Sequence, residues 1–126
     1  MRADNKTLFD QLGGEKAIEA AVTSFYKKVL VDKRITHFFE GVDKEKLHAH
    51  QKAFMTYAFG GTAQYSGRSL REAHAKLVEK MGLNDSHFDA VAENLRSTLK
   101  EMNIPGDLIS EVMAIVEGTR DSVLNR

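Results

Sequence analysis

Cysteine does not occur among the 126 residues of this sequence. Its absence excludes disulfide bonds, thiolate metal sites and thiol nucleophiles, so any metal must be held by histidine or carboxylate side chains. Charge of one sign is not in excess either, because 18 basic residues balance 18 acidic ones. A chain without net charge has no field that would steer it onto nucleic acid. We therefore expect no nucleic-acid partner.

Long apolar runs are missing as well. No stretch approaches the roughly 18 apolar residues that are needed to span a bilayer. The first residues, MRADNKTLF, lack the apolar region of a secretion signal. We therefore expect no membrane association and a cytoplasmic location.

Proline occurs once, at Pro105, and no window alternates between apolar and polar residues as a half-buried strand does. Apolar residues instead recur at three- and four-residue steps, which is typical of amphipathic helices. With 42% hydrophobic residues in 126, the chain can bury one core and one cofactor. The sequence thus predicts a single all-α domain over residues 1–126.

Capping residues and glycines divide the chain into predicted elements. The first long helix carries one apolar stripe, formed by Ile18, Val22, Phe25 and Val29. In chain order we predict a short turn over 7–12, a helix from Glu15, a short piece from Ile35 to Gly41, a helix from its N-cap Asp43 to the glycines at 60–61, an irregular loop over 62–67, a helix from about Ser69 to Met81 that stops at Gly82, a long helix capped by Asn84 or Asp85, and a last helix opened by Pro105 and weakened or ended at Gly118.

Two polar residues flank the apolar stripe of the helix that follows Asp43. At about 100° per residue, Phe54 and Ala58 fall within about 20° of Leu47, which marks the centre of the predicted buried face. Gln51 lies about 40° to one side and His50 about 60° to the other. Because an unpaired buried polar group costs roughly 1–3 kcal/mol, both side chains need a hydrogen-bond partner, a metal or a polar pocket.

The helix over 69–81 shows the same anomaly. His74 lies at the centre of its stripe, with Met81 about 20° away and Leu70 and Val78 about 40° away. Either histidine alone could be a core imidazole bonded to a carbonyl group. Two inward histidines on separate helices favour a cofactor instead.

Spacing excludes most metal sites. His48 and His50 diverge by about 160° on a helix, so they are no ligand pair, and we assign His48 to the surface. A di-iron site needs two Glu-x-x-His motifs, and only the one from Glu45 to His48 is present. Zinc needs a third inward ligand, which is missing. Haem needs only one or two axial imidazoles, a demand that His74 meets with or without His50.

A family resemblance adds to this reading. The run ITHFFEGVDKEKLHAHQKAF, followed by TYAFGGTAQYSGRSLREAHAKLV and HFDAVAENL, resembles the group I truncated haemoglobins, especially those of the cyanobacterial type. The likeness extends from the Leu-Gly-Gly at 12–14 nearly to the end of the chain. It includes both glycine pairs, the aromatic pairs at 25–26 and 38–39, and the histidine of REAH.

The resemblance implies an all-α truncated globin, a two-over-two helical sandwich around a haem. His74 would be the proximal ligand, bound to iron through Nε2, while its other ring nitrogen donates to a carbonyl group. Matching family positions place Tyr26, Leu47, His50 and Gln51 on the distal side. Phe39 would pack on the porphyrin, and Phe54 and Met55 would add to the apolar wall.

The expected role of the distal residues follows from the partial negative charge of bound oxygen. Oxygen gains negative character on ferrous iron, so the tyrosine hydroxyl and the glutamine amide would act as donors to it, in a catalytic role. Alternatively, Tyr26 and Gln51 bond only to each other. Many cyanobacterial relatives have glutamine where this chain has Leu47, which leaves more of the work to the other two. In relatives with a histidine at the position of His50, the imidazole can bind iron as a sixth ligand and must leave before oxygen enters.

The resemblance also suggests how the haem is held. Lys46, Tyr57 and Arg68 are candidates for the haem propionates, with ordinary solvated charge as the alternative. Some relatives attach haem covalently through a C-terminal histidine. Residues 116–126 contain none, so we predict non-covalent haem b. His37 and His87 are expected to be peripheral.

Three functions remain open. The first is binding of oxygen, nitric oxide and carbon monoxide, used in detoxification of nitric oxide and reactive nitrogen by a dioxygenase-type reaction supported by an unknown reductase; slow release suits this use better than oxygen transport. The second is a six-coordinate haem protein with His50 and His74 as ligands, for electron transfer or sensing. The third is a haem-free helical adaptor in which Tyr26, His50 and Gln51 are incidental core polar residues.

Overall fold

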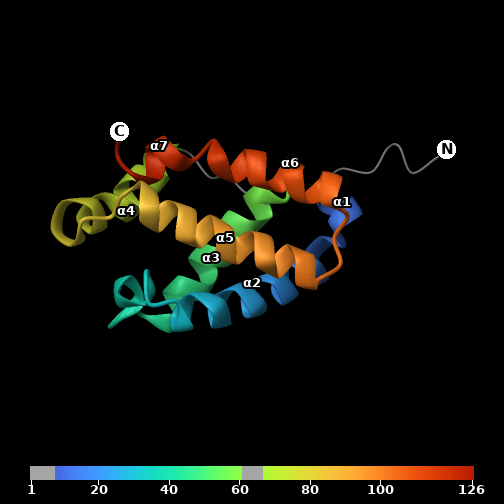
Figure 1. Ribbon diagram of the computed structural model, residues 1–126, viewed down its shortest axis with the longest axis horizontal. Helices are drawn as coiled ribbons and strands as arrows, with labels where there is room; N and C mark the ends of the chain where they lie inside the picture. Colours follow the sequence, from blue (N-terminus) through green and yellow to red (C-terminus); the bar gives the residue numbers. More distant parts are fainter. Residues whose placement is uncertain (1–7, 61–66) are drawn as a thin grey trace.

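The computed structural model of the protein describes residues 8–60 and 67–126, and describes side chains over 8–60 and 71–126. Within those ranges every regular element is helical (Figure 1). The elements are α1 (Leu8–Leu12), α2 (Gly14–Val31), the 3-10 helix η2 (Thr36–Phe39), α3 (Lys44–Ala58), α4 (Gly67–Met81), α5 (Asp85–Glu101), α6 (Gly106–Glu117) and α7 (Arg120–Val123). No helix in the described ranges is both long and apolar enough to cross a membrane.

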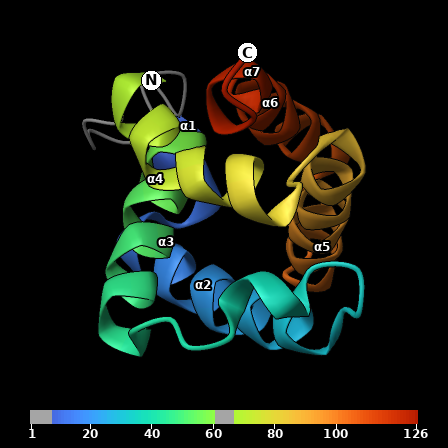
Figure 2. The same cartoon turned by 90° about the vertical axis from the view of Figure 1, so that its left-hand side faces the viewer.

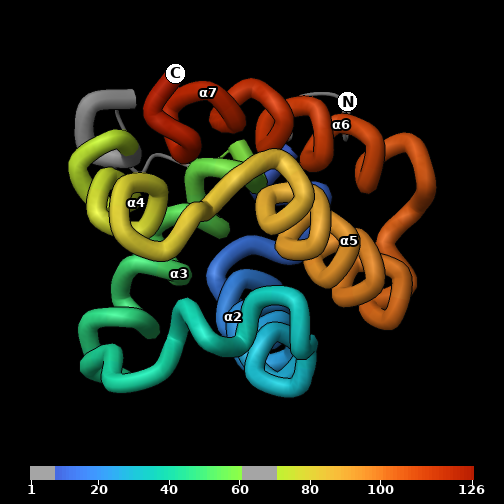
Figure 3. Tube along the Cα trace, turned by 60° about the vertical axis from the view of Figure 1, so that its left-hand side comes forward, coloured from blue at the N-terminus to red at the C-terminus, as the bar shows by residue number. Residues whose placement is uncertain are grey.

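Four long helices make a two-over-two sandwich. Helix α2 packs against α3 and also against α5, while α6 packs against α5 and α3, so the two pairs close on each other. Figure 2 looks along this arrangement, with α4 crossing one end of it. Figures 1 and 3 show α4 beside α7, and in Figure 1 this pair lies at the end of the molecule opposite α1. The predicted all-α, two-over-two arrangement of helices is therefore observed.

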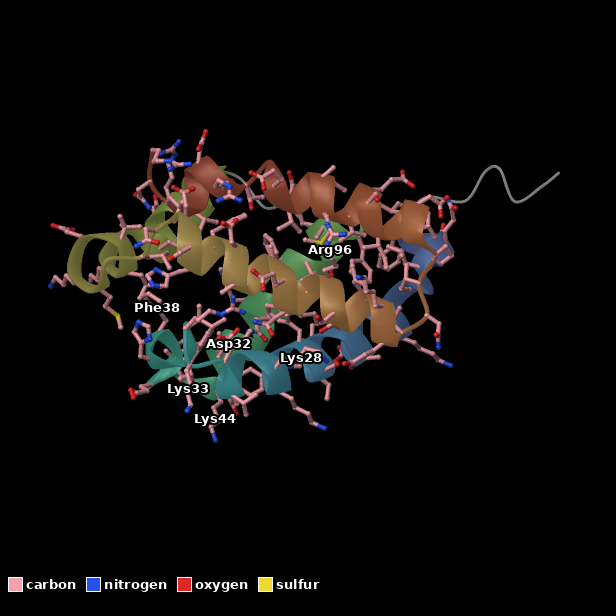
Figure 4. The ribbon with its side chains drawn as sticks, viewed as in Figure 1. Lys28, Asp32, Lys33, Phe38, Lys44 and Arg96 are labelled. Atoms are coloured by element: carbon pink, nitrogen blue, oxygen red, sulfur yellow. The ribbon has the colours of Figure 1, made fainter. Side chains whose placement is uncertain are left out.

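The contact between α2 and α5 combines an apolar core with an ionic edge. The predicted stripe of α2 is confirmed, because Ile18, Val22, Phe25 and Val29 are all buried. Polar contacts seal the edge, where Lys28 Nζ lies 2.7 Å from Glu101 Oε1 and Asn94 Nδ2 donates to Asp32 Oδ2 at 2.8 Å. Figure 4 labels Lys28 and Asp32 on the side of α2 that faces α5.

Helix starts and stops follow the predicted signals closely. Asp43 caps α3, since its side chain accepts from the backbone N–H groups of Glu45 and Lys46. Of the two predicted caps for α5, Asn84 is the one used. Gly82 ends the preceding segment at φ 69°, a left-handed backbone conformation that favours glycine.

Helix α2 begins at Gly14 and α3 ends at Ala58, each within about two residues of the prediction, and the other differences concern α4 and the last helices. Helix α4 begins at Gly67 rather than at about Ser69, because glycine is tolerated at a helix N-terminus. The last predicted helix ends at Glu117, and after Gly118 a further short helix, α7, was not predicted. The predicted loop over 62–67 lies outside the described residues except for Gly67, which is helical.

The buried faces of α3 and α4 also differ from the prediction. On α3 the fully buried residues are Gln51, Met55 and Ala58, whereas Leu47 is only half-buried. The face is rotated toward Gln51 because α3 packs against both α2 and α6, which the sequence of one helix does not reveal. On α4 no residue from 71 to 81 is fully buried, and Met81, predicted to be near the stripe centre, is 41% exposed.

Candidate functional site

Helices α3 and α4 bring their inward histidines together. The ring centroids of His50 and His74 lie 5.9 Å apart, with the ring planes inclined by 58°. Both side chains are half-buried. The Asp43 cap fixes the start of α3, which in turn sets the direction in which His50 projects two turns later. Residues that are 24 positions apart in the sequence thus lie close together. The apolar stripes predicted that both point inward, and the family resemblance implied that they share one site.

The surroundings of His50 keep its imidazole neutral. Burial lowers the pKa of His50 below its usual range, and the positive charge that His74 can carry lowers this pKa further. A neutral imidazole has a free electron pair on one ring nitrogen. Near neutral pH, His50 can therefore act as a metal ligand or as a hydrogen-bond partner without first losing a proton.

Gln51 carries a buried polar atom that the surrounding protein does not satisfy. The side chain is 7% exposed, and within the described residues its Oε1 atom has no hydrogen-bond partner. The Tyr26 hydroxyl, which we considered as its partner across the core, therefore does not donate to this oxygen. An unpaired amide oxygen of this kind costs roughly 1–3 kcal/mol, a cost usually retained where the group serves a ligand.

Apolar and amphipathic residues adjoin these polar groups. Tyr26, Phe39 and Phe54 are half-buried and pack against the hydrophobic core, in which Met55 is fully buried. Tyr57 and Leu47 are half-buried on α3, whereas Lys46 is exposed. The side chain of Arg68 lies outside the described part of the chain.

The donor set favours a cofactor that supplies most of its own ligands. Among the described residues no group of three or more histidine, aspartate, glutamate or cysteine side chains could hold a bare metal ion. The two facing imidazoles can still bind one iron that is already held in a porphyrin. Two axial imidazoles on one metal have their ring centroids about 6 Å apart, since each metal–nitrogen bond is about 2 Å and each nitrogen lies about 1 Å from its ring centre. The observed separation of 5.9 Å fits this demand.

The remaining histidines lie elsewhere. His48 is exposed, as predicted, and its Nε2 lies 3.7 Å from Glu19 Oε1. His37 is exposed and its ring centroid is 6.1 Å from that of His87. His87 has a structural role that sequence reasoning missed: its Nδ1 accepts the backbone N–H of Asn84 at 3.1 Å and completes a capping box for α5. The available signal was a histidine three residues after an asparagine cap, where glutamate or glutamine is usual.

Comparison with known proteins agrees with this geometry. Residues 7–125 match the family model described as bacterial-like globin. The chain is 62% identical over 109 residues to the group 1 truncated hemoglobin GlbN of Synechocystis sp., which covers 86% of this chain and 88% of that protein. It is also 41% identical over 121 residues to the group 1 truncated hemoglobin of Tetrahymena pyriformis, covering 96% of this chain and 97% of that one.

A solved structure supports the same assignment. The 2/2 hemoglobin from a Synechococcus species, solved in the cyanomet state with covalently attached heme, superimposes with a TM-score of 0.88. Sequence identity is 54%, and the match covers 96% of this chain and all of that chain, 100%. Family match, identity and fold thus converge, and the chain belongs to the group 1 truncated haemoglobins, the haem-binding two-over-two globins.

Proposed function

We propose that the protein binds haem b non-covalently, with His74 as the proximal iron ligand, and that it binds oxygen and other diatomic gases on the side of His50. The observation that carries this proposal is the facing pair of imidazoles, 5.9 Å apart at their centroids, one from α3 and one from α4. A second observation on the same helix is the buried Oε1 of Gln51, the residue after His50, which has no hydrogen-bond partner within the described residues.

The distal residues act by donating hydrogen bonds and excluding water. Bound haem supplies an iron that takes up diatomic gases and transfers one electron. The Tyr26 hydroxyl can donate a hydrogen bond, and the Gln51 amide can donate through Nε2 once it turns about its last torsion. Because Leu47, Phe54 and Met55 are apolar, they offer no competing donor and keep solvent from these groups.

Removal of His74 is the direct test of ligation. We expect His74→Ala to lose the Soret band of the wild-type protein or to shift it strongly, because no other imidazole lies on the described part of α4. His48→Ala is the matched control, since that histidine is exposed and lies on α3. A His74→Ala protein that takes up haem with an unaltered Soret band refutes the proposal.

For physiological use we propose detoxification of nitric oxide. When bound, haem would supply the one-electron chemistry of this reaction, in which oxygen and nitric oxide would take up one electron and give nitrate, and an unidentified reductase would have to resupply that electron. Hydrogen bonds from Tyr26 and Gln51 would slow the escape of oxygen by about five- to a hundredfold, which suits a reaction better than transport. Stopped-flow mixing of the oxygenated protein with nitric oxide should show rapid oxidation to the ferric form. Slow or absent oxidation would remove this role.

The short distance between the imidazoles specifically favours a second candidate, a six-coordinate protein for electron transfer or sensing. In this form His50 would occupy the sixth position, and the affinity for external gases would fall by the fraction of pocket that is open. The ferrous spectrum without added ligand distinguishes the two forms: split low-spin bands indicate ligation by both histidines, and a broad high-spin band indicates His74 alone. His50→Ala should convert the first spectrum into the second, while His48→Ala should leave it unchanged.

Contacts with the rest of the haem are proposed from the same region. Lys46, Tyr57 and Arg68 are assigned to the propionates, because an ammonium, a phenol and a guanidinium each donate to carboxylates. Non-covalent attachment is proposed because residues 116–126 contain no histidine. The proposals for the reductase and for the propionate contacts do not depend on the geometry of the histidine pair, so each needs its own test.

A further inference from the structure

Helix α4, which carries His74, is held in an unusual way. None of its residues from 71 to 81 is fully buried, whereas α2, α3, α5 and α6 each place several residues in the core. Its main packing partner is the short helix α7 near the end of the chain. Figures 1 and 3 show the two side by side. The position of α4 therefore depends on how α7 and the residues after it are fixed.

Two hydrogen bonds join α4 to the last residues of the sequence. Asn125 Nδ2 donates to the backbone oxygen of Arg71 at 3.1 Å. In the opposite direction, Arg71 Nη2 donates to the backbone oxygen of Arg126 at 2.8 Å. Asn125 has φ 61°, a left-handed backbone conformation that asparagine tolerates better than most residues. This turn of the backbone directs the Asn125 amide back to α4.

Ion pairs attach the same residues to the start of α5. Arg126 Nη1 lies 2.8 Å from Asp85 Oδ2, and Arg120 Nη1 lies 2.9 Å from Asp85 Oδ1, so one carboxylate joins both guanidinium groups. Arg120 also binds Asp89 at 2.6 Å and stacks over the ring of Phe88, 4.5 Å from its centroid. The Arg120 side chain is only 19% exposed, so these contacts are screened less than ordinary surface pairs.

We propose that these residues, Arg71, Asp85, Arg120, Asn125 and Arg126, form a C-terminal latch that positions α4 and thereby sets how firmly His74 holds iron. The proposal rests on the proposed role of His74. Arg71 and His74 are one helical turn apart, about 4.5 Å along the axis, so motion of the latched turn is passed directly to the imidazole. The anchor is rigid because α5 is packed into the core through Phe88, Leu95 and Leu99. These are positioning residues, since none of them touches the histidine pair in the contacts above.

The variants Arg71→Ala and Asn125→Gly test the latch in the haem-loaded protein. Asn125→Gly removes the amide and leaves the backbone free to keep its positive φ. Its matched control is Asn103→Gly, because Asn103 has φ 60° and lies between α5 and α6. Arg34→Ala is the control for Arg71→Ala, since Arg34 is a half-exposed arginine whose ion pairs are made with Asp32 and Glu93 and not with the last residues of the sequence.

Two measurements are needed for each variant. Hydrogen exchange of the α4 amides should accelerate about fivefold, the factor expected for one hydrogen bond, with exchange in α2 and α5 unchanged. Haem transfer to an acceptor globin should accelerate by a similar factor in the two latch variants and not in the two controls. Arg71→Lys should restore part of the slow rate.

Failure of the latch and failure of His74 ligation give different results. Exchange in α4 that matches the controls refutes the latch, whatever the haem does. Faster exchange with an unchanged rate of haem transfer refutes the positioning role. A Soret band that survives His74→Ala contradicts the proposed ligation. If hydrogen exchange still supports the latch in that case, the latch holds α4 but has no effect on iron binding.

Discussion

Gln51 offers the sharpest test of the site, because one substitution should raise the stability of the protein and weaken its retention of oxygen. Its side chain is 7% exposed and its Oε1 atom is unpaired within the described residues. Replacement by leucine keeps a similar volume and removes the unpaired oxygen, which costs roughly 1–3 kcal/mol when buried. We therefore expect Gln51→Leu to stabilise the haem-free protein against urea by about 1–2 kcal/mol.

Thermal unfolding should report the same change. For a domain of 126 residues, that free energy corresponds to a rise in Tm of about 3–8 °C. The haem-loaded variant should meanwhile release oxygen about tenfold faster, because it has lost one distal hydrogen-bond donor worth about 1.4 kcal/mol. Rapid mixing of the oxygenated protein with carbon monoxide measures that rate.

Gln11→Leu on α1 is the control for this prediction, since Gln11 is exposed. Its effect on the free energy of unfolding should stay within about 0.5 kcal/mol. A loss of more than about 1 kcal/mol in Gln51→Leu would refute the reasoning, because a loss of that size is the cost of breaking a hydrogen bond that the amide makes in the folded protein. An unchanged rate of oxygen release would show that Gln51 is not a distal donor.

Four further predictions follow from separate features. Hydrogen bonds from the Arg34 side chain hold the pKa of Asp32 far below its usual 3.8. The Asp32 carboxylate therefore adds to the free energy of unfolding above about pH 4, and this contribution is lost as the pH falls. Asp32→Asn should reduce the loss of unfolding free energy at low pH, which urea titrations measure. Burial lowers the pKa of His50 from 6.5, so as the pH falls the unfolded chain binds a proton at this residue before the folded protein does. The free energy of unfolding should therefore decrease below about pH 6.5, and His50→Leu should remove this dependence on pH. Asn84→Ala should cost about 1 kcal/mol of unfolding free energy, and an unchanged urea midpoint would deny the cap its role. Acidified organic solvent should extract all haem, because residues 116–126 hold no histidine, and a haem-shifted protein mass would contradict this.

Features fixed by local chemistry could be predicted from the sequence. The buried stripe of α2, the Asp43 cap and the end of the segment at Gly82 depend on neighbouring residues alone, and all three were predicted. The inward placement of His50 and His74 also followed from the periodicity of their two helices, whereas their proximity was implied by the family resemblance.

Features that depend on distant contacts could not be predicted. Gln51, rather than Leu47, lies at the centre of the buried face of α3, because the packing of α2 and α6 decides its rotation. Arg71 meets Asn125 across 54 positions of sequence, and charged residues of this kind look like ordinary surface residues until the chain is folded. No periodic pattern marks such a contact.

If His74 is the iron ligand, as proposed, the weak burial of α4 separates the part of this globin that maintains its architecture from the part that does its chemistry. Four well-packed helices can keep the domain folded while substitutions accumulate along the outer helix with little loss of stability. Iron reactivity could therefore diverge among related proteins, or be redesigned by exchanging the segment 71–81, without rebuilding the hydrophobic core.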